Sequence, residues 1–539
     1  MHATFEQITG AAFRLVPARP LRLLCALLVF ARTGSGLAAE AQAQAVANHK
    51  LPNILYILAD DMGVGDLSCL NPNSAWKTPN LDRLAAQGRT FTDAHSASGV
   101  CTPSRYAIMT GRYSFRGPLK SSVLHGYDKS LIEPNRLTVP QLLRNHGYAT
   151  AMFGKWHLGV DWVQAPGTIP GGTNVDFSKP FGGGPTAHGF DTFLGISASL
   201  DMPPYVYLKD NHALTLPTEW VQDSPKPKMW RAGVISPDFH HAEVQPRLIS
   251  ETVDYLKARA GAGEGKPFFI YLALAAPHTP IIPTAEFEGK TRSNPYGDFV
   301  AQVDADIGRV LKTLDELHLA DNTLVFFTAD NGCAPAVNLD ELKKLGHDPS
   351  AGARGHKADL FEGGHHEPFI ARWPGQTTPG SRCSQVIGQL DLLATCAEIV
   401  GAPLPDSAGE DSVSMLPLLR GRDTTARSQI GLVNESNNGS LAIHQGKWKL
   451  LLCPDSGGWS EPKPDSKLSR ELPKFQLYDL EADPTEKANV ESQHPEIVQR
   501  LGKLLAEQIQ RGRSTPGKDQ PYDKTTPWPQ TAWMSSFAQ

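Results

Sequence analysis

Short, nearly unbroken apolar segments recur along the chain, and each has the length of a β-strand. The clearest are residues 54–59 (ILYILA), 268–275 (FFIYLALA) and 324–328 (LVFFT), and residues 148–153 form a further candidate. A strand that is buried on both faces carries apolar residues at every position, whereas a half-exposed strand alternates apolar and polar residues. The pattern therefore predicts parallel strands in the middle of a covered sheet.

Amphipathic helices are predicted between these strands. Thr78 and Pro79 suit the N-cap and first turn of a helix that Gly88 ends. A second helical pattern places apolar residues from Val303 to Leu317 on one face and charged residues on the other. Alternation of strands and helices over about 350 residues predicts an α/β fold, a large doubly wound mixed sheet with helices on both faces.

The pattern changes in two later regions. Residues 159–240 are rich in Gly, Pro and aromatic residues with weak periodicity, which predicts long loops over the functional edge of the sheet. Residues 441–452 and 475–480 resemble half-exposed antiparallel strands, and residues 484–510 end in a helical pattern. A small C-terminal α+β subdomain with an antiparallel sheet is therefore expected.

The N-terminal segment has the layout of a secretory signal peptide. Arg14, Arg19 and Arg22 precede the apolar run 23–31, and alanines with A-x-A spacing follow. This run is shorter than the roughly 20 apolar residues of a membrane-spanning helix, and the sequence offers no later candidate. We therefore expect cleavage near residues 39–45 and export. The predicted organisation is a signal peptide at 1–45, an α/β catalytic domain at 46–430 and the α+β subdomain at 431–539.

Composition excludes several classes of protein. Of the 539 residues, 40% are hydrophobic and 20% are charged, which is enough apolar material for a sizeable core. The formal net charge of −5 gives no basic footprint for nucleic acid. The seven cysteines contain no CxxC pair, so they form neither a zinc-ribbon pattern nor a dense disulfide framework.

Polar residues follow four of the predicted strands. They are Asp60 and Asp61, Lys155 and His157, His278, and Asp330 and Asn331. In open α/β sheets, ligands bind beyond the carboxyl ends of the strands. Each residue alone has a structural explanation, such as a turn or a satisfied histidine, but four coincidences at one edge favour a functional site.

The oxygen-rich set indicates a class of metal. Three carboxylates and one amide oxygen are hard ligands that suit Ca²⁺ or Mg²⁺. A zinc site would recruit His or Cys, and His157 and His278 leave that alternative open.

Cys101-Thr102-Pro103-Ser104-Arg105 is the most specific local signal. Pro103 suits a first helical turn with Thr102 as its cap, which places Cys101 at a helix N-terminus, where free N–H groups attract an oxyanion. Arg105 can point its guanidinium at the same place. The alternative is a buried structural cysteine.

C-x-P-x-R resembles the maturation signature of the type I sulfatases, which belong to the alkaline phosphatase superfamily. In that family the cysteine is oxidised to Cα-formylglycine (3-oxoalanine). Further motifs match from about residue 51 to residue 490: NILYILADDMGVGDLSC, TPNLDRLAAQG, CTPSRYAIMTGR, GKWHLG, APHTP, FFTADNG, GHKADLFEGG and LYDLEADPTEKANV. The chain is most similar to members of the arylsulfatase A and N-acetylgalactosamine-6-sulfatase type.

This resemblance implies a cofactor, a maturation step and a set of site residues. One Ca²⁺ per chain is expected, and a formylglycine-generating enzyme would modify Cys101. The implied metal ligands are Asp60, Asp61, Asp330, Asn331 and the modified Cys101. The implied catalytic residues are Cys101, Arg105, Lys155, His157, His278 and Lys357.

Two positions depart from the family pattern. His366 stands where many members have arginine, and Phe361 stands where Trp or Tyr is common. The first change removes any ion pair that the arginine would make, but it leaves the core mechanism intact.

The implied mechanism has two steps. A hydroxyl of the hydrated aldehyde attacks sulfur in line with the departing alcohol, which gives a covalent sulfo-enzyme. His278, alone or together with Lys357, protonates the leaving oxygen, while calcium, Arg105, Lys155 and Lys357 neutralise the sulfate oxygens. His157 then takes the proton of the second hydroxyl, so that sulfate departs and the aldehyde returns.

Three alternatives stay open at this point. A metal-dependent phosphatase or phosphonate monoester hydrolase of the same superfamily would hold phosphate in a similar way. A non-enzymatic carbohydrate-binding protein could retain the motifs. Cys101 could also be a structural cysteine in a disulfide, and the pairing of Cys69, Cys333, Cys383, Cys396 and Cys453 is equally open.

The family resemblance implies a sulfated carbohydrate of galacto configuration as the expected substrate. The loops 181–185 and 198–207 are candidates to contact the leaving alcohol, either by stacking on a sugar or by packing on the core. The expected location is periplasmic or secreted, or lysosomal in a eukaryote.

Overall fold

The computed structural model describes residues 51–167, 174–225, 228–263 and 265–537. Residues 51–539 form one compact unit. The predicted signal peptide at 1–45 lies outside the described residues. Within those residues, no helix combines the length and the apolar character needed to cross a bilayer.

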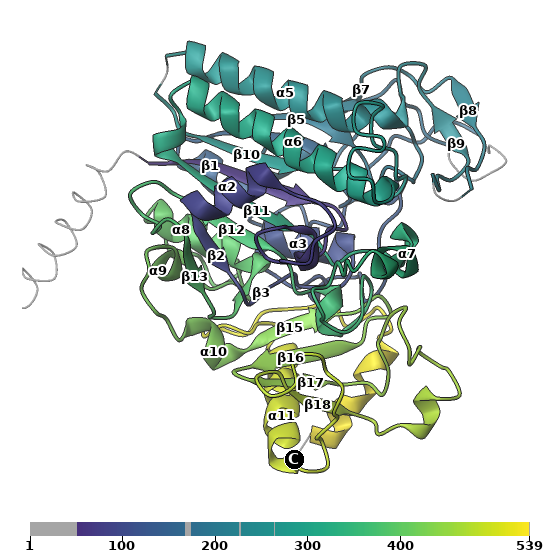
Figure 1. The fold of residues 1–539 in the computed structure, drawn as a ribbon, viewed down its shortest axis with the longest axis vertical. Coiled ribbons are helices and arrows are strands. Elements are labelled where there is room, and N and C mark those ends of the chain that lie inside the picture. Colours follow the sequence, from purple (N-terminus) through teal and green to yellow (C-terminus); the bar gives the residue numbers. More distant parts are fainter. Residues whose placement is uncertain (1–50, 168–173, 226–227, 264, 538–539) are drawn as a thin grey trace, which may run out of the picture. The chain divides into compact units, whose positions relative to one another are not determined.

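A ten-stranded mixed sheet forms the centre of the protein (Figure 1). Its strands are β1 (Asn53–Ala59), β2 (Arg89–Phe91), β4 (Ala149–Lys155), β5 (Thr192–Ile196), β6 (Leu208–Lys209), β7 (His212–Ala213), β10 (Phe268–Ala273), β11 (Thr323–Ala329), β12 (Phe369–Arg372) and β13 (Ser381–Cys383). They lie in the order β13-β2-β12-β11-β1-β10-β4-β5-β6-β7. The neighbours β11, β1, β10, β4 and β5 pair in parallel, and the four strands predicted from apolar runs are all among them.

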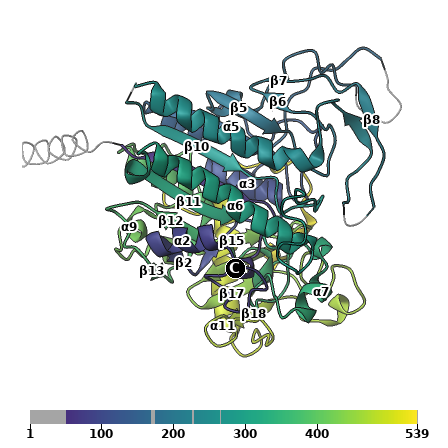
Figure 2. The ribbon, with the colours of Figure 1, turned by 45° about the horizontal axis from the view of Figure 1, so that its top comes forward.

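Helices cover both faces of this sheet, as the sequence predicts (Figure 2). One face carries α2 (Pro79–Gln87), α5 (His241–Gly261) and α6 (Pro295–Glu316), and the other carries α3 (Cys101–Thr110), α4 (Val139–Asn145) and α8 (Leu392–Ile399). Side chains of β1 alternate between the two layers: Leu55 and Ile57 pack on the first side, and Tyr56 and Leu58 on the second. Burial on both faces explains why the strand is apolar throughout.

Part of the prediction for residues 159–240 is wrong. This region contains β5, β6 and β7 of the main sheet, together with the separate pair β8 (Glu219–Val221) and β9 (Gly233–Ile235). β5 pairs in parallel with β4, from Ala151↔Thr192 to Lys155↔Ile196. Strands of two to five residues are too short to show a period, so the Gly and Pro content dominated the sequence pattern.

Several other short elements contribute to the described chain. They are β3 (Ala94–His95), β14 (Ile387–Gly388), α7 (Leu339–Lys344), α9 (Leu416–Leu419), α10 (Ala426–Ile430) and the 3₁₀ turn η6 (Glu362–Gly364). β3 pairs in parallel with β14 in a sheet of their own.

A separate antiparallel sheet lies near the C-terminus, as predicted. It consists of β15 (Leu432–Glu435), β16 (Leu441–Gln445), β17 (Trp448–Leu451) and β18 (Gln476–Asp479), and α11 (Pro495–Arg511) follows it. Its strands are almost wholly buried rather than half-exposed. Leu501 and Leu505 of α11 pack with one set of its side chains, and Leu360 and Phe361 pack with the other.

Buried ion pairs also join this sheet to the larger part of the molecule. Lys449 of β17 lies 2.7 Å from the carboxylate of Glu362 in η6 and 2.8 Å from that of Glu486. The backbone N–H of Glu362 donates to Glu486 at 2.7 Å. Residues from three segments that are far apart in sequence therefore meet at one buried lysine.

Candidate active site

The carboxyl ends of the central strands bring the predicted acidic residues together. Pairing of Ala59 with Ala329 aligns the ends of β1 and β11, so Asp60 and Asp330 follow at the same edge. The N–H of Asp330 donates to the carbonyl of Ala59 at 3.1 Å, and the N–H of Asp61 donates to the Asp330 carboxylate at 3.2 Å. The predicted convergence at this edge is confirmed for these residues.

Cys101 is the first residue of α3, a helix whose ten residues are all buried. The N-cap is Val100, so the prediction that Thr102 caps this helix is wrong. The Thr102 hydroxyl instead accepts a hydrogen bond from the N–H of Leu124 at 3.1 Å. The helix begins two residues earlier than the Pro103 signal suggested, and Cys101 still lies at its N-terminus.

Three cationic side chains face three carboxylates in the interior. Lys155 lies 2.8 Å from both carboxylate oxygens of Asp60. The guanidinium of Arg105 donates to Asp330 at 2.9 Å, and Lys357 donates to Asp61 at 2.6 Å. All six side chains are buried, so each charge is balanced by a partner rather than by water.

These pairs control the ionisation of the two neighbouring aspartates. Burial alone would raise the pKa of Asp60, but the Lys155 ammonium, with His278 and Arg105, lowers that pKa to about 2. Burial likewise opposes ionisation of Asp61, whose pKa is nevertheless lowered by His278 and Lys357. Both carboxylates are therefore ionised at neutral pH and available to a cation.

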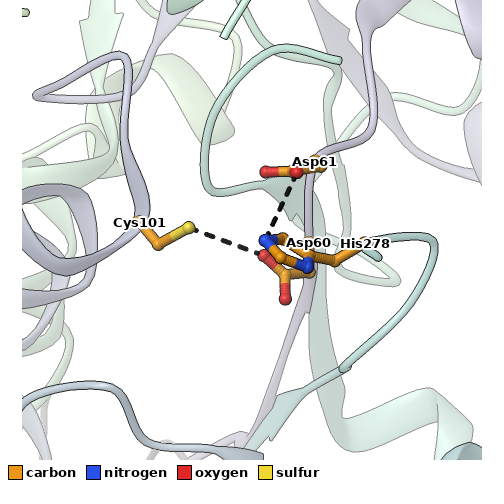
Figure 3. A group of neighbouring side chains, drawn as sticks. All are labelled: Asp60, Asp61, Cys101 and His278. Atoms are coloured by element: carbon orange, nitrogen blue, oxygen red, sulfur yellow. Dashed lines mark hydrogen bonds and ion pairs between the residues drawn. The ribbon is translucent and has the colours of Figure 1, made fainter. Parts of the chain in front are cut away.

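Cys101 points towards Asp60 (Figure 3) and also contacts Lys357. Its Sγ is 3.8 Å from Oδ1 of Asp60 and 3.6 Å from Nζ of Lys357. Burial raises the pKa of the thiol to about 12, so the side chain is protonated at neutral pH and is a poor thiolate nucleophile.

The disulfide alternative for Cys101 is not supported. The six cysteines in the described part of the chain, Cys69, Cys101, Cys333, Cys383, Cys396 and Cys453, are all free.

The donor set fits a hard divalent cation. Asp60, Asp61, Cys101 and His278 offer ligand atoms within 4.8 Å of one another. Asn331 donates its Nδ2 to Asp61 at 2.7 Å, while its Oδ1 is buried without a hydrogen-bond partner. A buried, unpaired amide oxygen beside ionised carboxylates suits Ca²⁺ or Mg²⁺.

His157 has one ring nitrogen that is hydrogen-bonded and one that is not. Its Nε2 lies 2.7 Å from the carbonyl of Leu124, so Nε2 carries the hydrogen and donates it. The other nitrogen, Nδ1, is buried and has no hydrogen-bond partner. Burial, with the Lys155 and Arg105 charges, lowers the pKa of His157 well below its ordinary value, so the Nδ1 lone pair stays free.

His278 faces Asp61 (Figure 3). Its Nδ1 lies 2.6 Å from the carbonyl of Thr279 and donates to it, which directs Nε2 towards Asp61 at 3.5 Å.

Sequence reasoning missed the groups that orient both imidazoles. The carbonyls of Leu124 and Thr279 are backbone atoms, and backbone acceptors leave no signature in residue types. The candidate substrate loops are also better defined by the structure. Phe181, Tyr205 and Tyr207 are buried against neighbouring aromatic rings, so the alternative of packing on the core is correct for them.

Comparison with known proteins gives the class and then the family. N-Acetylgalactosamine-6-O-sulfatase of Bacteroides thetaiotaomicron is 33% identical over 500 residues, which cover 85% of this chain and 93% of that protein. Human arylsulfatase A is 33% identical over 482 residues, which cover 86% of this chain and 89% of that protein. A solved Bacteroides thetaiotaomicron structure, from a study of the metabolism of multiple glycosaminoglycans, has a TM-score of 0.74 at 31% identity and covers 86% of this chain and 100% of that one.

The protein is therefore an enzyme of the sulfuric ester hydrolase class. The sulfatase family model matches residues 52–402, and the chain belongs to this family.

Proposed function

We propose that the enzyme removes sulfate from a carbohydrate of the galactose or N-acetylgalactosamine sulfate type. The observation that carries the proposal is the position of Cys101, which lies at the N-terminus of a buried helix between Asp60 and Lys357. The sulfatase family resemblance implies that Cys101 is converted to formylglycine, and the raised pKa of its thiol, which makes a thiolate nucleophile unfavourable, supports this part of the proposal. A formylglycine, as its hydrate, supplies a hydroxyl nucleophile and a second hydroxyl from which the sulfate can be released.

Three cations of the chain are proposed to bind the sulfate group. Nζ of Lys357 lies 3.6 Å from Sγ of Cys101. Arg105 of α3 and Lys155 of β4 both contact the carboxylate of Asp60. Fixed charges in a buried site stabilise a developing anion without reorganisation of water. The same charges discriminate against a neutral ester.

Asp60, Asp61, Asp330 and Asn331 are proposed to hold one Ca²⁺, next to the modified residue 101. Bound calcium would supply positive charge for the sulfate oxygens. The residues that surround it fix the geometry. The Asp330 carboxylate contacts both the Arg105 guanidinium and the N–H of Asp61, and Asn331 contacts Asp61.

His157 and His278 are proposed to move the protons. The free Nδ1 of His157 suits a base, and its neutral form persists through the physiological range of pH. His278 presents Nε2 next to Asp61 and suits the acid that protonates the leaving alcohol.

The carbohydrate substrate rests on the similarity to an N-acetylgalactosamine-6-O-sulfatase. Maturation by a formylglycine-generating enzyme, and export through the predicted signal peptide at 1–45, belong to the same proposal.

Mass spectrometry of the peptide that contains residue 101 tests the modification. We expect the mass of formylglycine in protein from a host with the maturation enzyme, and an unmodified thiol in a host without it. Cys101→Ser should retain sulfate on the enzyme and lose turnover, because serine has no second hydroxyl. Cys69→Ser, at a partly exposed cysteine, is the matched control and should keep wild-type turnover.

A substrate panel tests the activity itself. Free sulfate is measured with galactose and N-acetylgalactosamine that carry sulfate at different positions, with an aryl sulfate and with an aryl phosphate. Release from the galacto-configured sugars supports the proposal. Activity on aryl sulfate alone contradicts the carbohydrate assignment, and preference for the phosphate contradicts the sulfatase activity.

A further inference from the structure

A second cluster of potential metal ligands lies in a different part of the molecule from Cys101. Asp93, His95 in β3 and His444 in β16 each offer a ligand atom, and these atoms lie within 4.8 Å of one another. Both imidazoles are buried. The cluster joins the segment that precedes α3 to the C-terminal sheet.

His444 is held in the tautomer that leaves one nitrogen free. Its Nε2 lies 2.8 Å from the carbonyl of Gly446 and donates its hydrogen there. The residue is only 4% exposed, and its Nδ1 is buried without a hydrogen-bond partner among the described residues. In metal sites, a ligating histidine characteristically donates its second ring N–H to such a carbonyl, which orients the free lone pair.

His95 also presents a nitrogen to an acceptor. Its Nδ1 lies 3.1 Å from Nδ1 of His365, whose Nε2 lies close to both the carbonyl of Leu360 and the Lys449 ammonium. The other nitrogen of His95, Nε2, faces Oδ1 of Asp93 at 2.7 Å. A hydrogen on Nε2 satisfies this contact, and a metal bound there would take the place of that hydrogen.

A neighbouring group of potential metal ligands is already in contact with a lysine ammonium. His95, Glu362 and His365 also offer ligand atoms close together. Lys449, however, lies 2.7 Å from Glu362 and 3.1 Å from His365 Nε2, so an ammonium fills that place. Among the residues that the structure describes, no lysine is hydrogen-bonded or ion-paired to Asp93, His95 or His444.

The cluster borders a cavity of about 640 Å³. Asp93, His366 and His444 line it, together with Arg427 and Lys447, and none of its lining residues belongs to the proposed sulfate site. His366, the residue that departs from the family pattern, stacks its ring on His95 with centroids 5.2 Å apart. The cavity gives an ion access to the cluster and leaves space for water beside it.

We propose that Asp93, His95 and His444 bind one divalent transition metal of the zinc class, with an open position towards the cavity. Two imidazoles and a carboxylate form a borderline donor set that prefers Zn²⁺ or Co²⁺ to Ca²⁺, in contrast to the oxygen-rich set at Asp60 and Asp61. The bound metal would tie β16 to β3 and so hold the C-terminal sheet against the segment that leads to Cys101.

Cobalt binding to the full-length protein, without a histidine tag, tests this site. The protein is stripped with a chelator, saturated with Ca²⁺ to fill the oxygen site, and titrated with Co²⁺ while the visible absorption is recorded. We expect one Co²⁺ per chain with the absorption of a four- or five-coordinate ion, displaced by Zn²⁺. His444→Ala should weaken binding by about tenfold or more.

Two variants keep the result interpretable. His444→Cys should restore Co²⁺ binding and add an intense sulfur-to-cobalt charge-transfer band, which only direct ligation produces. His212→Ala, at an exposed histidine of β7, should leave the titration unchanged. The proposal is overturned if the wild-type protein binds no Co²⁺ in the presence of Ca²⁺, or if folded His444→Ala binds it as tightly as the wild type.

Discussion

The Nζ of Lys155 lies 2.8 Å from each carboxylate oxygen of Asp60, and both side chains are completely buried. A buried pair of this kind stabilises the fold little by itself, because desolvation offsets most of the attraction. Loss of one partner is costly, however, since it leaves the other charge without compensation. Lys155 therefore keeps Asp60 ionised in the absence of metal.

Lys155→Met should destabilise the metal-free enzyme by about 3–5 kcal/mol, because it isolates the Asp60 charge. Calcium should reduce this loss, since the ion would compensate the same carboxylate. Urea unfolding with and without Ca²⁺ measures the effect, and Lys312→Met at an exposed i,i+4 pair is the control. An equal loss in both conditions would contradict calcium binding at Asp60.

His157→Gln should lower kcat by about 10²- to 10⁴-fold, the usual contribution of a general base. Because the pKa of His157 is lowered well below 6.5, the wild-type imidazole is neutral at pH 7, and the acidic limb of the kcat profile should lie below pH 6.5. His212→Gln is the control for an exposed histidine. A wild-type limb at or above pH 6.5 would exclude His157 as the group that titrates.

The same pKa shift has a consequence for stability. Since the folded state holds His157 with a lowered pKa, the unfolded state binds more protons below pH 6.5. The contribution of the neutral imidazole to the free energy of unfolding is therefore complete above pH 6.5 and declines as the pH falls below that value. His157→Gln should lack this component in a series of unfolding curves.

Glu435→Gln should stabilise the protein at alkaline pH. Burial raises the pKa of Glu435 to about 7, and the hydrogen bond from Ser114 at 2.7 Å only partly opposes this. Below the unfolded pKa of 4.5 the carboxyl is neutral in both the folded and the unfolded state. As the pH rises from there through 7, the free energy of unfolding of the wild-type protein falls by about 3 kcal/mol. The amide does not titrate, so above pH 7 the free energy of unfolding of the variant should have risen relative to that of the wild type.

Thermal unfolding at several pH values measures this difference. Glu507→Gln, at an exposed position of α11, is the control and should follow the wild type at every pH. A Glu435→Gln variant that runs parallel to the wild type would show that Glu435 ionises normally.

Removal of calcium should abolish turnover and lower the unfolding temperature. A ligand that binds only the native state at 100 times its Kd stabilises it by about 2.7 kcal/mol. Ca²⁺ should restore both properties to the chelated wild type, and Asp330→Asn should show a smaller calcium-dependent shift. An unfolding temperature that is independent of Ca²⁺ in the wild type would argue against the oxygen site.

The central strands and the acidic edge could be predicted because their signals are local. An unbroken apolar run followed directly by Asp60 or Asp330 records both burial and position in a few consecutive residues. The short strand β5 lacked such a run, and its pairing with β4 depends on the sheet rather than on its own sequence. The burial of β16 and β17 depends on Leu360 and Phe361, about 80 residues earlier, so a strand pattern could not reveal it.

The cluster of Asp93, His95 and His444 was missed for the same physical reason. Its members come from segments that are more than three hundred residues apart, so no spacing connects them. The only sequence sign was His366, an exchanged residue that lies against His95.

The link from Lys357 through Glu362 to the C-terminal sheet makes the candidate site depend on residues late in the chain. Lys357 contacts Cys101, and Glu362, five residues later, is held by Lys449 and Glu486. These contacts are complete only when residues up to Glu486 have joined the fold. Cys101 is 1% exposed in the folded protein, so the proposed oxidation of its thiol would have to precede that stage.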